Sequence, residues 1–133
     1  MGSLILSIIL GGVLAYGLGV PWYMALSRPW MAAAGLKDSD MQGSSQGLLY
    51  ASAFAAWLVS SAVLNLAVFP LLAAEAGLGR ILGLTVSLWL AFAMLSTLLS
   101  TMFGMRGRAL LWIDGGYTLL GSLLIALVHH FIA

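Results

Sequence analysis

The chain has 133 residues, of which 62% are hydrophobic and 7% are charged, and its formal net charge is +1. This composition is far from that of soluble domains and indicates an integral membrane protein, while the small net charge excludes a strongly basic surface for nucleic acid. The chain has no cysteine, which excludes disulfides, thiol catalysis and cysteine-ligated iron–sulfur clusters.

The few charged residues leave four long runs that hold at most one charge each. A helix needs roughly 20 apolar residues to cross a bilayer core, and each run is that long. We therefore predict an all-α fold, a four-helix transmembrane bundle with short loops that forms a single membrane domain over residues 1–133. The expected spans are residues 3–26, 48–73, 81–103 and 109–131.

The end of the first span carries helix-breaking and aromatic residues. Pro21 is expected to kink the helix, and Trp22 and Tyr23 follow where aromatic residues meet the membrane interface. Residues 27–29, Ser-Arg-Pro, are typical of a helix stop followed by a new start. Residues 30–35 are then predicted to form a short interfacial segment that ends at a glycine, between the first and second spans.

The remaining connections are either polar or short. Residues 37–46 form the only extended polar stretch, and Ser39 with Gln42 has the spacing of a helix-capping box. The connections at residues 74–80 and 104–108 are too short for anything except antiparallel neighbours. The second, third and fourth spans are therefore predicted to form two successive hairpins.

The basic residues predict the orientation in the membrane. One side is expected to hold Arg28, Lys37, Arg106 and Arg108, and the other side holds Arg80 alone. Because Lys and Arg are enriched in cytoplasmic loops, the first side is predicted to be cytoplasmic. We expect a multi-pass protein of the bacterial cytoplasmic (inner) membrane with both termini external.

Small residues recur at every fourth position in the first and third spans. Lipid provides no hydrophobic drive for helix association, so small residues are needed for close packing. These packing residues are Ser7, Gly11, Ala15 and Gly19 in the first span, and Gly79, Gly83 and Ser87 in the third. The ribbons either pack the bundle internally or, for one ribbon, face another protomer. The expected partners are the lipid bilayer and either a homo-oligomer or a larger membrane complex.

Asp114 is the only carboxylate inside an apolar span. An acidic residue costs about 2.5–3.5 kcal/mol at the centre of a bilayer and less near the interface, so we expect it to face the bundle and to have a partner. One interpretation is a proton or cation site. The other is a structural ion pair with Arg28, Arg106 or Arg108, which are expected at the same level.

The surroundings of Asp114 predict a polar cluster on the cytoplasmic side. Ser96 and Ser100 share one face of the third span at the expected depth of Asp114, and Tyr117 follows Asp114 by about one turn. The predicted cluster comprises Trp22, Tyr23, Arg28, Ser96, Ser100, Asp114 and Tyr117. The alternative is that the serine hydroxyls bond only to carbonyls of their own helix.

Other polar residues in the spans predict packing rather than chemistry. Asn65 is expected to form an interhelical hydrogen bond. His129 and His130 point about 100° apart on a helix, so they cannot readily chelate one ion and are expected to be interfacial. The sequence has no metal-ligand, phosphate-loop or dinucleotide-binding motif and no catalytic constellation. We therefore expect no cofactor, no metal and no catalytic residue.

Several motifs together resemble a known family. They are residues 19–23, 30–31 and 35–36 around the end of the first span, and residues 89–92 and 113–117 in the third and fourth spans. They resemble the small bacterial membrane proteins grouped as domain of unknown function 1761, from the first span to about residue 40 and again from about residue 89 onward. The resemblance implies a topology and one cytoplasmic-side cluster, but it brings no residue roles. The members of that cluster would be Trp22, Tyr23, Trp30, Asp114 and Tyr117.

Two functions remain open from the sequence. The first is a small polytopic membrane protein that binds or passes a small solute or ion near Asp114. The alternative is a non-catalytic accessory or scaffold subunit of a larger membrane complex. Small multidrug exporters also have four spans, but they depend on an acidic residue in the first span, where this chain has none. The sequence does not define a substrate.

Overall fold

The computed structural model describes residues 2–36 and 46–133, which are almost entirely helical. The elements are α1 (Gly2–Ala34), α3 (Gln46–Val63), η1 (Leu64–Val68), η2 (Phe69–Leu71), α4 (Leu78–Leu88), η3 (Trp89–Met94), α5 (Leu95–Phe103) and α6 (Ala109–Ile132). The π-helical segments η1 and η3 and the short 3-10 turn η2 continue the helices before them, so the elements form four long helices. Each is long and apolar enough to cross a membrane, which confirms the predicted four-helix transmembrane bundle.

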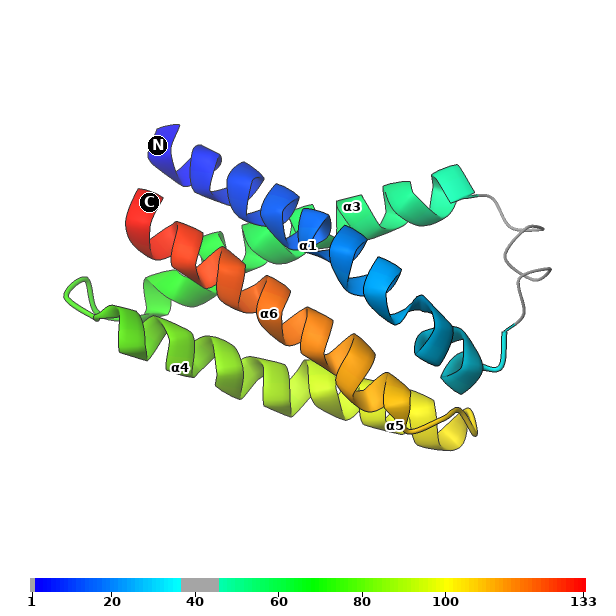
Figure 1. Cartoon of the computed structure of the whole chain (residues 1–133). Helices are drawn as coiled ribbons and strands as arrows, with labels where there is room; N and C mark the ends of the chain where they lie inside the picture. The colour runs from blue at the N-terminus through cyan, green and yellow to red at the C-terminus, as the bar shows by residue number, and fades with distance from the viewer. Residues whose placement is uncertain (1, 37–45) are drawn as a thin grey trace.

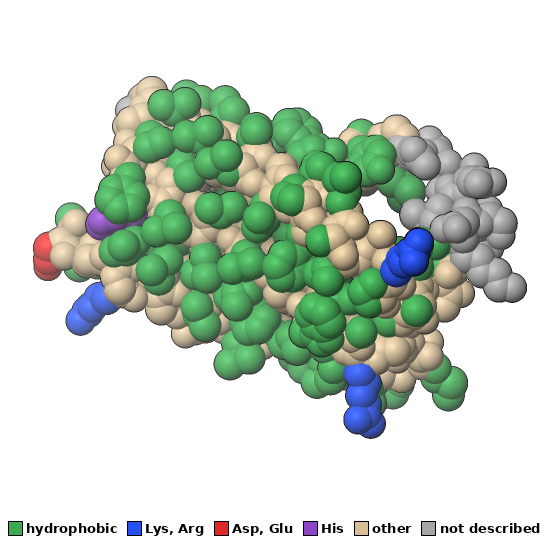
Figure 2. All heavy atoms as spheres, in the orientation of Figure 1, with side chains coloured by type: hydrophobic (Ala, Val, Ile, Leu, Met, Phe, Trp, Pro, Cys, Tyr) green, Lys and Arg blue, Asp and Glu red, His purple; other side chains and the backbone are tan. Residues whose placement is uncertain are grey.

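Successive helices run antiparallel, and both termini lie at the same end of the bundle (Figure 1). We call this end the terminal end. The opposite end, which holds the C-terminal end of α1, the start of α3 and the α5–α6 connection, we call the basic end. Figure 2 shows hydrophobic side chains covering the middle of the visible face, with Lys and Arg side chains only toward the two ends. This distribution is the one expected for helices surrounded by lipid.

The first helix does not stop where the sequence predicted. α1 is continuous for 33 residues and contains both Pro21 and Pro29 within it. It ends at Gly35, whose φ of +73° is the left-handed conformation of a helix C-cap, and the Leu36 N–H donates to the Met31 carbonyl at 2.9 Å. At about 1.5 Å per residue, α1 is longer than a hydrocarbon core of about 30 Å, so part of it extends beyond the core or tilts.

The prediction that the helix ends near Pro29 is wrong. Proline removes only one backbone hydrogen-bond donor, and side chains on both sides of Pro29 hydrogen bond α1 to the neighbouring helix α6. Trp22 and Trp30 of α1 both donate hydrogen bonds to α6. The predicted capping box at Ser39 and Gln42 lies outside the described residues.

The two predicted hairpins are present. Residues 72–77 join η2 to α4, and residues 104–108 join α5 to α6. The second connection is held against the end of α1, because the Gly107 N–H donates to the Ala33 carbonyl at 2.6 Å. A Cβ atom at Gly107 would lie 2.8 Å from the Ala33 Cα, so only glycine allows this approach.

The small-residue ribbon of α1 packs inside the bundle. Ser7, Gly11 and Ala15 are buried, and a Cβ at Gly11 would lie 3.1 Å from the Ser61 Oγ and 3.5 Å from the Ile125 Cα. Of the two interpretations of this ribbon, internal packing is therefore the one that the structure supports.

The small-residue ribbon of the third helix faces away from the bundle. Gly79, Gly83 and Ser87 are exposed, and a Cβ at either glycine would meet nothing within 4 Å. The reason is that α4 turns its larger residues, Ile81 and Thr85, into the bundle. The predicted packing role of this ribbon is therefore not fulfilled within one chain.

Candidate functional site

Asp114 lies near the start of α6 at the basic end, half-buried between helices. The Tyr23 hydroxyl donates a hydrogen bond to its Oδ1 at 2.6 Å, and the Trp30 indole Nε1–H donates to the same oxygen at 3.0 Å. Tyr23 and Trp30 are two helical turns apart on one face of α1. This arrangement depends on α1 continuing past residues 27–29, because Trp30 would otherwise belong to a separate segment.

The main chain on both sides of Asp114 accepts further indole donors. Trp22 Nε1–H donates to the Ile113 carbonyl at 2.9 Å. Trp89 Nε1–H, from η3, lies 2.9 Å from the Gly115 carbonyl and 3.0 Å from the Thr118 Oγ1. Residues 113, 114 and 115 therefore each accept an indole N–H, from two different helices. Buried indoles need a partner, and this stretch of α6 supplies it.

The two glycines after Asp114 make room for side chains. A Cβ at Gly116 would lie 3.0 Å from the Trp22 ring, and a Cβ at Gly115 would lie 3.0 Å from the Met94 Sδ. Two adjacent glycines at the start of a span let another backbone or a ligand come close. In the structure, side chains of the same protein approach them.

Tyr117 joins the cluster through its ring and its hydroxyl. Its hydroxyl lies 2.8 Å from the Ala15 carbonyl and donates to the backbone of α1. Its ring packs edge-on against Tyr23, with centroids 5.3 Å apart, and against Trp57, with centroids 5.2 Å apart. At this level α1, α3 and α6 therefore meet in a layer of aromatic rings, in which the Tyr23 and Tyr117 hydroxyls are both hydrogen bonded.

The predicted arginine partners do not reach Asp114. Arg28, Arg106 and Arg108 are exposed, and among the described residues none forms an ion pair with Asp114. The structural ion pair is therefore not formed. Long basic side chains at the end of a span keep their charged groups in the polar interface, where they are hydrated.

The two predicted serines also lie away from the cluster. Ser96 and Ser100 are exposed and form no hydrogen bond with Asp114, whereas Thr101 of the same helix is 2% exposed. The π-helical turn η3 lies just before them, and the extra residue in such a turn changes which face of the following helix is buried. The depth of these serines in the membrane, which can be predicted from the sequence, does not by itself determine this face.

The second carboxylate oxygen of Asp114 has no donor among the described residues. Every fully enclosed side-chain oxygen or nitrogen in the described parts of the chain has a hydrogen-bond partner, so this Oδ2 is not fully enclosed. Asp114 is thus held by two neutral donors on one oxygen, and its other oxygen is accessible.

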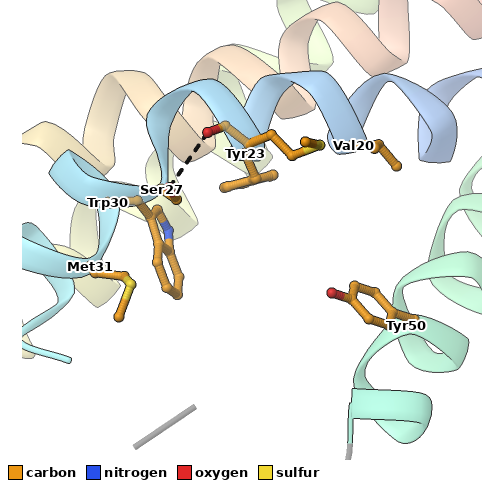
Figure 3. Close-up of a pocket in the computed structure, with 7 residues that line it drawn as sticks. Val20, Tyr23, Ser27, Trp30, Met31 and Tyr50 are labelled. Carbon is orange, nitrogen blue, oxygen red and sulfur yellow. Dashed lines mark hydrogen bonds between the residues drawn. The ribbon is translucent and has the colours of Figure 1, made fainter. Parts of the chain in front are cut away.

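A cavity of about 510 Å³ lies beside this cluster, between α1 and the start of α3. Its lining residues are Val20, Tyr23, Met24, Ser27, Trp30, Met31 and Tyr50. Figure 3 shows Tyr50 projecting from α3 toward the α1 side chains across the open space. Tyr23 and Trp30 therefore have two roles, since they donate to Asp114 and also form part of the cavity wall.

A second polar group lies toward the terminal end. Asn65 forms the expected interhelical hydrogen bonds, with Ser7 of α1 at 2.9 Å and with His129 of α6 at 2.7 Å. His130, which follows His129 in the chain, is exposed. Within residues 2–36 and 46–133, no three His, Asp or Glu side chains come together as metal ligands.

Sequence reasoning missed the roles of Trp89 and Trp57. Trp89 bridges η3 to α6, and the Trp57 ring lies over Gly121, where a Cβ would clash with a carbon of the ring. A tryptophan in the interior of a span is a signal in itself, because its N–H must find an acceptor inside the bundle.

Residues 6–130 match the family model described as "Protein of unknown function (DUF1761)". No curated protein and no solved structure gave a match to this chain. The match covers nearly the whole chain and includes every residue of the Asp114 cluster.

Proposed function

We propose a function from the geometry of this chain, which belongs to the family of proteins of unknown function DUF1761, a description that assigns no activity. The protein is a small membrane protein that binds a small organic cation in the cavity beside Asp114. Passage of the same solute across the membrane would require this binding as its first step.

The supporting observation is the unpaired charge of Asp114. In the described residues its carboxylate has hydrogen bonds from Tyr23 and Trp30 but no cationic partner. A carboxylate within a span is costly without a counter-charge. A cation in the adjacent cavity would supply that counter-charge, and it would enter a space whose walls already contact the carboxylate.

The cavity wall favours an organic cation over a hydrated metal ion. Tyr23, Trp30 and Tyr50 offer aromatic rings, whose faces attract cations. Met24 and Met31 add flexible, polarisable side chains that fit irregular apolar bodies. The wall offers few oxygen atoms to replace the hydration shell of a small metal ion.

The expected contribution of the charge can be estimated. Two unit charges about 8 Å apart, with an effective dielectric constant of about 20, attract each other by about 2 kcal/mol. This corresponds to a factor of about 30 in affinity.

The test is binding of tetraphenylphosphonium to the purified full-length chain by equilibrium dialysis. Asp114→Asn keeps the shape and the acceptor oxygen but removes the charge, so the affinity should fall by about 30-fold. Glu75→Gln is the matched control, because Glu75 is an exposed carboxylate in the connection at the opposite end. Equal affinity in the wild type and in Asp114→Asn would refute the proposal. So would equally tight binding of the neutral analogue triphenylphosphine oxide.

We further propose that the protein lies in a bacterial inner membrane with the basic end in the cytoplasm. Arg28, Arg106 and Arg108 belong to that end, while Arg80 follows the 72–77 connection at the other. Both termini lie at the terminal end and would be external (Figure 1). A reporter that is active only in the cytoplasm should be inactive when fused after Ala133, and activity would reverse the topology.

The exposed ribbon of α4 favours a second candidate function, that of an accessory subunit or a self-associating protein. Gly79, Gly83 and Ser87 offer a backbone that another helix could approach closely. The chain lacks cysteine, so single-cysteine variants report contacts without background. Gly83→Cys should give disulfide-linked dimers in native membranes if a second copy covers the ribbon. Stoichiometric co-purification with one larger complex would instead indicate an accessory subunit.

A further inference from the structure

The polar group around Asn65 has a fixed donor pattern. Asn65 is 1% exposed, and its Nδ2 donates to the Ser61 carbonyl at 2.9 Å. A carbonyl can only accept, so the amide nitrogen must face Ser61 and the amide oxygen must face the other way. The Ser7 hydroxyl donates to that Oδ1 at 2.9 Å. The orientation of the amide therefore follows from its neighbours.

This pattern determines the tautomer of His129. Its Nδ1 lies 2.7 Å from the Asn65 Oδ1, which is an acceptor only, so Nδ1 carries the hydrogen. In the neutral ring, Nε2 then has a free lone pair. Nε2 has no partner among the described residues, and it is not fully enclosed.

The His129 ring lines a cavity of about 580 Å³ at the terminal end. The ring is positioned by Phe69, whose centroid lies 4.6 Å away. Other walls come from Leu4 of α1, Leu72 and Ile81. Apart from His129 and the buried Asn65, the side chains that line the cavity are hydrocarbon, and none carries a formal charge.

We propose that this cavity is a second ligand site, for a neutral amphiphile with a phenol or alcohol hydroxyl as its head group. The hydroxyl donates a hydrogen bond to the Nε2 of His129, and the apolar body lies against Phe69, Leu72 and Ile81. A donor is required because Nε2 offers a lone pair, and a neutral head group fits because no side chain in the wall carries a charge that would balance an ion. The site lies apart from the Asp114 cavity and does not depend on its proposed function.

The first test measures the tautomer by NMR of the full-length chain labelled with ¹⁵N-histidine in detergent micelles. For neutral His129 we expect a proton on Nδ1 and an unprotonated Nε2, the reverse of the tautomer that dominates in free histidine. His130, which is exposed, serves as the internal reference. Finding His129 as the Nε2–H tautomer would overturn the proposal, because the lone pair would be absent.

The second test compares 4-octylphenol with its methyl ether, 4-octylanisole, which has the same body and no donor. The phenol should bind about five- to tenfold more tightly and should shift the Nε2 resonance of His129. His129→Leu should abolish this preference, whereas His130→Leu should keep it. If His129→Leu fails to fold, the wild-type titration still decides. Equal affinity for both probes, or an Nε2 resonance that does not respond to the phenol, would overturn the proposal.

Discussion

The small-residue ribbons of α1 and α4 look alike in sequence but lie in opposite environments. On α1, Gly11 is so close to its neighbours that an added Cβ would lie 3.1 Å from the Ser61 Oγ. On α4, the same addition at Gly83 would meet nothing within 4 Å. A period of four residues therefore indicates a surface that permits close approach, but it does not say whether the same chain covers that surface.

The difference arises from where the large residues on the face opposite each ribbon point, toward lipid or toward the bundle. α1 has exposed Ile5, Leu6 and Ile9 opposite its ribbon, so its large residues meet lipid and its small residues meet protein. α4 turns Ile81 and Thr85 inward, and its small residues remain outside. For a helix in lipid both arrangements are possible, because lipid does not penalise exposed hydrocarbon.

The largest expected effect is the difference in stability between a bulky substitution in the α1 ribbon and the same substitution in the α4 ribbon. Gly11→Leu should destabilise the bundle by about 3 kcal/mol, because the new side chain overpacks the contact with Ser61 and Ile125. Gly83→Leu, the matched variant on α4, should leave the free energy of unfolding within about 0.5 kcal/mol. Titration with SDS from a mild detergent measures both. Equal losses for the two variants would remove the distinction between the ribbons.

The number and order of the spans could be predicted because they depend only on length and hydrophobicity, which sequence displays directly. The position at which α1 ends could not be predicted in this way. Pro29 is a local signal for a break, and it was outweighed by the bonds of Trp22 and Trp30 to residues 113 and 114, which are distant in sequence. No local pattern reveals those bonds.

The candidate site was predictable to a similar extent. The cost of a charge in lipid was enough to expect that Asp114 would have a partner, and the structure supplies Tyr23 and Trp30. Ser96 and Ser100 illustrate the limit, since the register change at η3 cannot be read from hydrophobicity. Arg28 illustrates another limit, because nearness in depth does not make an ion pair when hydration competes.

A smaller effect is expected where one methyl group meets an aromatic ring. Gly121→Ala brings its Cβ into a clash with the Trp57 ring, so the ring must move away from position 121 and its edge-on contact with Tyr117 must change. We expect a loss of about 1–2 kcal/mol in the free energy of unfolding. Gly83→Ala adds the same methyl group on the uncovered ribbon and should cost nothing. A neutral Gly121→Ala would show that Trp57 has another low-energy position.

The next effect tests the aromatic layer between α1 and α6. Tyr117→Phe keeps the ring contacts and removes the donor to the Ala15 carbonyl, so the loss should be about 0.6–1 kcal/mol. Tyr50→Phe is the control, because Tyr50 is 61% exposed on α3. Thermal unfolding in one detergent compares them. A larger loss for Tyr50→Phe would contradict the assignment of the layer as the tighter contact.

The smallest effect separates two serine hydroxyls whose hydrogen bonds have the same length. Ser61 of α3 donates to the Ile8 carbonyl of α1 at 2.8 Å, whereas Ser87 of α4 donates to the Gly83 carbonyl of its own helix at 2.8 Å. Ser61→Ala removes an interhelical bond, and about 0.6 kcal/mol is typical of such bonds in membranes. Ser87→Ala should change the free energy of unfolding by less than about 0.3 kcal/mol, because a hydroxyl bonded within its own helix adds little to the stability of the bundle.

The difference should be measured at several protein concentrations in SDS titrations. If the effect of Ser87→Ala grows with protein concentration while that of Ser61→Ala does not, the α4 ribbon is covered by a second copy. If neither depends on concentration and Ser87→Ala costs as much as Ser61→Ala, the two ribbons do not differ in the way that their environments indicate.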